Sequence, residues 1–111
     1  MRRFKEYIED LHINDLTTKE QLSIGISVIQ IQCTKTIDFG LHKHTSMNQT
    51  ISVISGEIQD IKVETDIITY KKGDCLFIPK NNQHRLRYCA GCELLVVYIP
   101  GLKNKFLKTQ V

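Results

Sequence analysis

Residues 41–56 read LHKHTSMNQTISVISG and residues 73–88 read GDCLFIPKNNQHRLRY. In both stretches histidine stands beside a run in which apolar and polar residues alternate, as they do on a half-buried β-strand. His42 and His44 are two residues apart, so on a strand both imidazoles point to the same face. His84 shares its face with Leu86 and Tyr88. An apolar face points inward, and the two stretches therefore predict three histidines that converge inside a β-structure.

Gln49 adds a polar side chain to this expected interior. It has the same strand parity as Ile51 and Val53, so it should also point inward. Buried polar groups cost free energy unless they are paired, and a divalent transition metal is a partner that suits imidazole. A His-x-His pair alone is more often a pair of histidines on an edge strand, so the case depends on the residues around it.

The surrounding chain indicates an all-β fold. From Ser23 to Pro100, short runs rich in Ile and Val are separated by turn signals, and no strand–helix–strand rhythm occurs. Many short strands of even spacing are typical of a sandwich or a barrel. In SIGISVIQIQC (23–33) the apolar set changes parity, which predicts a bulge near Val28. Turn signals stand at Phe39-Gly40, Ser55-Gly56, Gly73-Asp74, Asn81-Asn82 and Ala90-Gly91.

The residue pattern at the ends of the chain differs from that of the β-rich middle. Apolar residues at helical spacing in RRFKEYIEDL (2–11) predict a short helix, and LTTKEQ (16–21) has the composition of a polar link. We therefore expect one domain over residues 1–111, with an N-terminal arm (1–22), a barrel core (about 23–100) and a C-terminal tail (101–111).

Composition restricts the function classes. The chain has 111 residues, 41% of them apolar, which suits one globular domain. Its net charge of +3 is spread out and has no aromatic platform beside it, which argues against nucleic-acid binding. No apolar run is long enough for a membrane span, and the basic N-terminus has no apolar stretch behind it, so we expect a cytoplasmic protein.

The spacing of the histidine stretches resembles that of the cupin family. The first cupin motif places His-x-His, then Glu, then Gly, and His42-Lys43-His44, Gln49 and Gly56 follow that spacing. The second motif places Gly, Pro-x-Gly, His and Asn, and Gly73, Pro79-Lys80-Asn81, His84 and Tyr88 follow it. The resemblance extends from about Ile24 to Pro100 and implies a small jelly-roll or double-stranded β-barrel.

The departures from the family pattern change the expected chemistry. Gln49 stands where the family usually has Glu, and Asn81 stands where it has the turn glycine. Asn tolerates the left-handed backbone conformation better than most residues do. A glutamate would cancel one charge of a bound metal, whereas the amide oxygen of Gln49 is neutral. A divalent ion would then keep its full charge and favour an anionic ligand.

The resemblance also implies the site and its cofactor. One divalent transition metal (Zn, Mn, Fe, Ni or Cu) is expected at His42, His44, His84 and Gln49. Residues expected to line the pocket are Met47, Ile51, Phe77, Tyr88 and Tyr98. A homodimer is expected as well, with the apolar strand in 23–33 as the partner surface.

Several functions remain open at this point. A metal-dependent isomerase, cyclase or lyase would act on a small oxygenated or sugar-derived molecule. Small cupins that process unsaturated uronates have a similar three-His, one-Gln site, but they rely on an acidic residue in the last strand, where this chain has Val96. The alternatives are a non-enzymatic module that binds or senses small molecules or sugars, and an Fe(II) dioxygenase.

The cysteines give weaker signals. Cys89 and Cys92 form one CxxC pair around Ala-Gly, which is typical of a hairpin turn, since structural zinc needs four ligands. Cys33 and Cys75 lie in predicted strands and are expected to be small core residues. In a cytosolic protein all four should be reduced.

Overall fold

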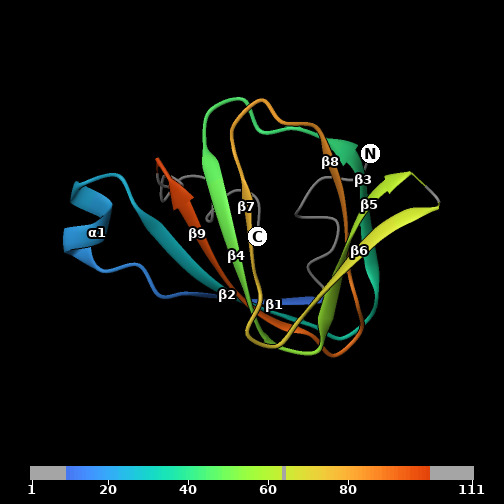
Figure 1. The fold of residues 1–111 in the computed structure, drawn as a ribbon. Helices are drawn as coiled ribbons and strands as arrows, with labels where there is room; N and C mark the ends of the chain where they lie inside the picture. The colour runs from blue at the N-terminus through green and yellow to red at the C-terminus, as the bar shows by residue number, and fades with distance from the viewer. Residues whose placement is uncertain (1–9, 64, 101–111) are drawn as a thin grey trace.

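Two antiparallel sheets pack face to face and make up the molecule (Figure 1). The computed structural model describes residues 10–63 and 65–100. Within them the elements follow in the order β1 (Leu11–Asp15), α1 (Lys19–Ser23), β2 (Ser27–Cys33), β3 (Ile37–His42), β4 (Asn48–Ser55), β5 (Glu57–Val63), β6 (Asp66–Lys71), β7 (Cys75–Ile78), β8 (His84–Tyr88) and β9 (Glu93–Ile99).

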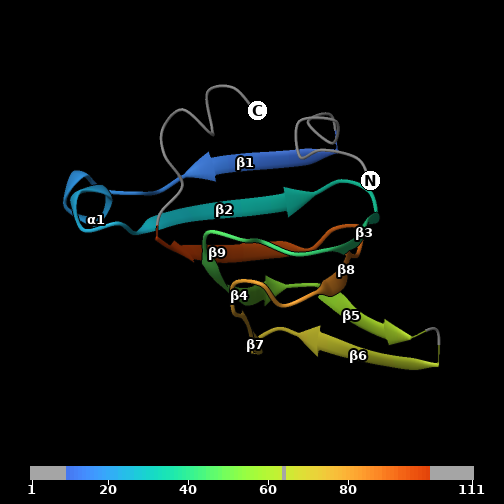
Figure 2. The same cartoon turned by 90° about the horizontal axis from the view of Figure 1, so that it is seen from above.

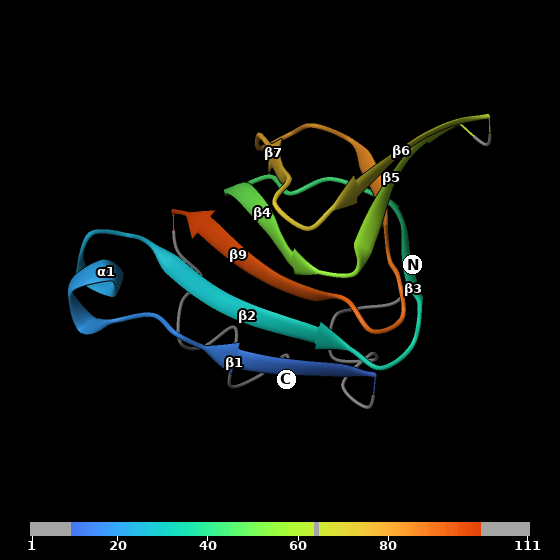
Figure 3. The ribbon, with the colours of Figure 1, turned by 60° about the horizontal axis from the view of Figure 1, so that its bottom comes forward.

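The strand order is that of a small jelly roll. One sheet has the order β1-β2-β9-β4-β7 and the other has the order β3-β8-β5-β6. Figure 2, a view from above, shows β1, β2 and β9 running side by side, and Figure 3 shows the two layers curving around a shared interior. The predicted all-β, double-stranded barrel is confirmed.

Strand alternation creates the core between the sheets. On β2 the odd-numbered residues Ile29 and Ile31 are buried, and on β9 Leu94 and Val96 are buried while their neighbours are partly exposed. Because successive side chains point to opposite faces, each strand gives one apolar row to the interior. The second sheet contributes Ile37, Ile58, Leu86 and Tyr88.

The N-terminal region differs from the prediction. The helix expected over 2–11 lies outside the described residues except for its last two, and Leu11 begins β1, which pairs with β2 over its whole length. The expected polar link instead contains α1, which Thr18 caps with both bonds of a capping box. No helix in the described part of the chain is long and apolar enough to cross a membrane.

The parity change in 23–33 does not produce a bulge. β2 pairs with β1 and β9 without a register shift, because Ile24 and Ile26 precede the strand and Val28 alternates with the buried Ile29 and Ile31. A bulge occurs instead in β3, between Asp38 and Leu41, where Gly40 has a φ of 75°. This backbone conformation suits glycine, and the extra residue changes which face the following side chains occupy.

One end of the barrel collects the segments that carry histidine. The β3–β4 loop and the β7–β8 loop lie together at the upper end of Figure 1, and the β5–β6 hairpin extends to the right of them. β3 ends there at His42 and β8 begins there at His84. We call this end the mouth of the barrel.

Candidate metal centre

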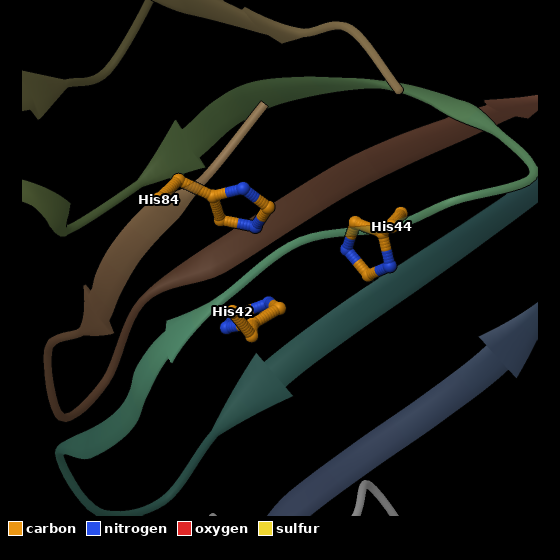
Figure 4. A group of neighbouring side chains, drawn as sticks. All are labelled: His42, His44 and His84. Atoms are coloured by element: carbon orange, nitrogen blue, oxygen red, sulfur yellow. The ribbon is translucent and has the colours of Figure 1, made fainter. Parts of the chain in front are cut away.

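His42, His44 and His84 meet at the mouth (Figure 4). His42 and His84 are direct partners in the β3–β8 ladder. His44 lies two residues past the end of β3, so it is a loop residue rather than the strand residue that we expected. Its carbonyl oxygen accepts a hydrogen bond from the backbone N–H of Asn81 at 2.6 Å. Asn81 has a φ of 66°, and the predicted left-handed turn thereby fixes the loop that carries His44.

The geometry of the three rings suits a single ion. One ligand atom from each histidine lies within 4.8 Å of the others. The ring centroids are 4.2 Å apart for His42 and His84, 5.2 Å for His42 and His44, and 5.3 Å for His44 and His84. Zinc binds imidazole nitrogen at about 2.1 Å, so two nitrogens on one tetrahedral ion lie roughly 3.4 Å apart. Small ring rotations would bring the three atoms, which lie within 4.8 Å of one another, to that separation.

Backbone carbonyls fix the orientation of two of the rings. Nδ1 of His42 lies 2.9 Å from the carbonyl oxygen of Gly40, and Nδ1 of His84 lies 2.9 Å from that of Asn82. A carbonyl only accepts, so each Nδ1 carries the proton and donates. Each Nε2 then has a free lone pair. This tautomer, with the proton on Nδ1, is the one in which a histidine can bind a metal through Nε2.

Burial keeps two of the rings neutral. Burial, together with the neighbouring charges of His42 and His84, lowers the pKa of His44 to about 4. Burial is also the largest cause that lowers the pKa of His84, against the opposing hydrogen bond to Asn82. Metal binding needs neutral imidazole, and the site therefore holds its donors in the required form.

Gln49 points into the same interior. It lies on β4 with only 4% of its surface exposed, and its Nε2 donates to the hydroxyl of Tyr98 at 3.4 Å. Its Oε1 is buried and has no hydrogen-bond partner. The side chain lies close enough to His44 to raise the pKa of that ring, although burial and the neighbouring histidines lower it by more. An unpaired amide oxygen therefore lies near His44.

An ion pair on the outer face joins the two strands that carry His42 and His84. Nη2 of Arg85 on β8 contacts Oδ2 of Asp38 on β3 at 2.6 Å, and Nε contacts both carboxylate oxygens at 3.2 Å. Asp38 Oδ1 also accepts the N–H of Gly40 at 2.9 Å, within the bulge. The hydrogen bond from Arg85 is the main reason that the pKa of Asp38 is lowered. Sequence reasoning missed this pair.

The residues expected to line a pocket occupy different places. Ile51 is fully buried, Tyr98 is opposite Gln49 in the β4–β9 ladder, and Met47 is partly buried against the core. Tyr88 is buried four residues along β8 from His84, with its ring 4.6 Å from that of Phe39. Phe77 is 60% exposed and alternates with the inward-facing Leu76 and Ile78, so it is turned away from the interior.

Asp60 and Lys62 on β5 were also missed. Asp60 is 4% exposed, on the buried face of its strand. Lys62 pairs with it at 2.9 Å. The available signal was parity, because Asp60 has the same parity as Ile58 in the run EIQDIKV.

The cysteines lie away from the histidines. The backbone N–H of Cys92 donates to the carbonyl of Cys89 at 3.0 Å, which confirms the turn. The group of side chains in the described residues that could hold a metal contains no cysteine. Cys33 is buried as expected, whereas Cys75 is exposed because it shares the outer face of β7 with Phe77.

Comparisons with known proteins agree with the fold. The family model described as "Cupin domain" matches residues 34–98. KdgF from Halomonas sp. superposes with a TM-score of 0.70 at 11% identity, over 88% of this chain and 84% of that one. An RmlC-like cupin from Shewanella frigidimarina gives 0.68 at 22% identity, over 87% and 81%.

A third solved structure has a similar fold. A protein from Thermotoga maritima described as a predicted oxalate decarboxylase gives a TM-score of 0.64 at 21% identity, over 81% of this chain and 80% of that one. No match to a curated protein was found.

Proposed function

This chain belongs to the cupin domain family, and on that basis we propose that it is a metal-dependent enzyme acting on a small anionic, oxygen-rich molecule. His42, His44 and His84 hold one divalent transition metal, and the side-chain oxygen of Gln49 completes the set. The reaction is an isomerase, cyclase or lyase step on a carbonyl or hydroxyl compound, such as a sugar-derived acid.

The observation that carries the proposal is the set of unpaired donor atoms. Nε2 of His84 and Oε1 of Gln49 are buried without partners. A buried polar atom without a partner destabilises a fold, so two at one place indicate a ligand that satisfies both. The neighbouring His42 presents its own Nε2 lone pair.

The donor set also argues for an anionic substrate. Three neutral imidazoles and an amide cancel none of the charge of a divalent ion. Such an ion, when bound, supplies a Lewis acid that polarises a carbonyl or enol oxygen. The chain's own residues orient the substrate: apolar side chains exclude water behind the site, and the hydroxyl of Tyr98 keeps Gln49 in place.

A non-enzymatic binding or sensor module is the second candidate. The observation that favours it is that the group of ligating side chains contains no carboxylate. Without a proton acceptor at the ion, binding would not lead to turnover.

The test begins with elemental analysis of the purified protein together with mass spectrometry of co-purified small molecules. We expect about one transition metal per chain, and we expect the His42→Ala, His44→Ala variant to lose it while circular dichroism shows an intact β-fold. His12→Ala is the matched control, because His12 is exposed and lies outside the triad. Undiminished metal in the double variant would exclude the site.

A turnover assay distinguishes the proposed enzyme from the sensor module and from an Fe(II) dioxygenase. Metal-loaded protein is incubated with a panel of oxo acids, hydroxy acids and unsaturated uronates, and products are followed by NMR. Conversion that requires the metal but no dioxygen supports the proposed enzyme. Tight binding without conversion supports the sensor, and consumption of dioxygen identifies an Fe(II) dioxygenase.

A further inference from the structure

We propose that Asp60 and Lys62 form a second binding subsite at the mouth, which recognises a hydroxyl and a carboxylate of a small hydroxy acid. This inference rests on the proposed function only in taking the three histidines as the metal site. Its test includes metal-stripped protein, so the result does not depend on the metal.

Three buried side-chain atoms have no hydrogen-bond partner in the described residues: Gln49 Oε1, His84 Nε2 and Asp60 Oδ1. The first two belong to the metal centre. Asp60 does not, because it lies outside the group of atoms within 4.8 Å of one another. Its unpaired oxygen therefore needs a partner of its own.

The ladder places Asp60 beside the metal centre. Asp60 is the partner of Leu86 in the β5–β8 pairing, and Leu86 is two residues from His84 on the same face. Asp60 and Ile58 share the buried face of β5. The pairing of Asp60 with Leu86 and the 2.9 Å contact between Lys62 and Asp60 bring both groups beside the strand that carries His84.

The two oxygens of Asp60 are in different situations. Oδ2 forms an ion pair with Nζ of Lys62 at 2.9 Å, while Oδ1 has no hydrogen-bond donor. A buried carboxylate is stable only when its oxygens are hydrogen-bonded. A carboxylate can only accept, so the missing partner is a donor group.

Lys62 supplies the complementary charge. Its side chain is 49% exposed while that of Asp60 is 5% exposed, so the ammonium reaches solvent and its anchor does not. The ammonium carries three donors and Asp60 Oδ2 engages one of them. The remaining donors are open to the carboxylate of a ligand.

The chemistry of the pair defines the ligand. A group that donates to Oδ1 and an anion that meets Nζ are both present in a hydroxy acid, in which a hydroxyl and a carboxylate stand on neighbouring carbons. A simple dicarboxylate offers the anion but no donor. The hydroxyl is therefore the feature that this subsite distinguishes.

Succinate and malate are suitable probes, because they differ by a single hydroxyl. Their affinities are measured by calorimetry for zinc-loaded and for metal-stripped protein. We expect one enantiomer of malate to bind wild type about tenfold more tightly than succinate, which is the effect of one charge-assisted hydrogen bond. Metal-stripped protein should bind both acids more weakly and keep the preference.

Variants assign the preference to its residues. Asp60→Leu cannot accept a hydrogen bond, so the two acids should bind equally, while urea unfolding shows stability maintained or increased. Asp60→Asn keeps a neutral acceptor and should show an intermediate preference. Lys62→Gln should weaken both acids several-fold and leave their ratio unchanged. Lys35→Gln is the matched control, since Lys35 also pairs with an aspartate but lies in the β2–β3 turn.

Two results would overturn the subsite. One is equal affinity for malate and succinate in wild type, or no binding of either acid. The other is a preference that persists in Asp60→Leu, which would mean that Asp60 is a structural ion pair satisfied by water. The ratio of the malate and succinate affinities is also measured in metal-stripped protein, so it does not depend on the metal. A failure of the metal site would instead appear as missing metal in the elemental analysis.

Discussion

Gln49 is the residue that most distinguishes this metal centre. Spacing and strand parity predicted that it points inward, and the structure gives its Oε1 no partner. The hydroxyl of Tyr98 binds its Nε2, so the amide is oriented with its oxygen free. As a neutral donor, Gln49 would leave the full charge of a bound ion available to an anionic ligand.

The first prediction follows from that neutrality. Gln49→Glu should bind metal as tightly as wild type or more tightly, and it should weaken a dicarboxylate, because the added negative charge opposes the anion at close range. Gln49→Ala should loosen the metal. The measurement is titration of cobalt-substituted protein with succinate, followed by its visible spectrum.

Gln59→Glu provides the matched control for that experiment. Gln59 lies on the same barrel but its Oε1 is bound by Arg87, on the face that alternates with the buried one. A spectrum and an affinity that do not change in Gln49→Glu would place Gln49 away from the metal.

The second prediction concerns His44 and pH. In the metal-free protein its pKa is lowered from 6.5 to about 4, mainly by burial. Between these values the unfolded chain binds a proton that the folded chain does not, so the free energy of unfolding should fall as pH drops from 6.5 to about 4. His84, whose pKa is also lowered, acts in the same direction.

Urea unfolding at a series of pH values measures this effect. His44→Gln should show a smaller loss over the same window, while the exposed His12→Gln should behave as wild type. Unfolding free energies that stay level from pH 6.5 to 4 would show that His44 is not held neutral by burial.

At the scale of elements, the pairing of β3 with β8 positions the metal centre. The bulge at Gly40 turns His42 to the inner face, and Asp38 contacts both the bulge and Arg85. The third prediction is that Asp38→Ala lowers metal affinity about tenfold, as loss of an outer partner of a metal ligand does. The readout is competition with a zinc chelator.

The control for Asp38→Ala is Asp10→Ala, which removes the carboxylate of a looser pair with Lys35 at 3.8 Å. Urea unfolding curves of both variants show whether a loss of zinc affinity comes from a misplaced histidine or from a less stable fold. If Asp38→Ala and Asp10→Ala bind zinc equally well, the outer ion pair does not position the site.

The β4–β5 turn requires glycine for a packing reason. Gly56 has a φ of 74°, and a Cβ there would lie 2.7 Å from the Cα of Cys92. The fourth prediction is that Gly56→Ala destabilises the protein by about 2–4 kcal/mol, from backbone strain together with the clash. Urea unfolding measures it.

Gly91 isolates the contribution of the clash. It has a φ of 84° but nothing within 4 Å of an added Cβ. Gly91→Ala should therefore cost only the backbone strain. Equal destabilisation by the two substitutions would mean that the approach of Cys92 to Gly56 is relieved without cost.

At the scale of the whole molecule, the apolar surface favours self-association. Leu16, Leu22 and Ile24 are 44%, 38% and 73% exposed around α1, beside the edge strand β1. The strand in 23–33 that we expected to be the partner surface is less apolar on its outer face, which carries Val28, Gln30 and Gln32. We therefore expect the partner surface at the β1–α1 end.

The fifth prediction is a homodimer, with light scattering giving twice the chain mass of 12.8 kDa. Ile24→Asp should shift it toward monomer, because it places a charge in an apolar contact. Val63→Asp is the control, since Val63 is 60% exposed on the far sheet. A monomer mass at all concentrations of the wild type would contradict the prediction.

The sequence alone determined the fold class, the positions of most strands and turns, and the identity of the three histidines. These features depend on local rules: alternation with a period of two, left-handed turn residues such as Asn81, and motif spacing. Phe77 was assigned to the pocket on residue type alone, although its parity with Cys75 rather than Ile78 marks the outer face.

Only the tertiary structure decided which polar residues join the histidines. The bulge in β3 changes the parity between Ile37 and His42, and the pairing of β5 with β8 brings Asp60 toward His84 although they are far apart in sequence. Neither relation is local, because register between strands depends on how the whole apolar interior packs. For that reason the cluster of three histidines could be predicted from spacing, whereas the Asp60–Lys62 pair could not.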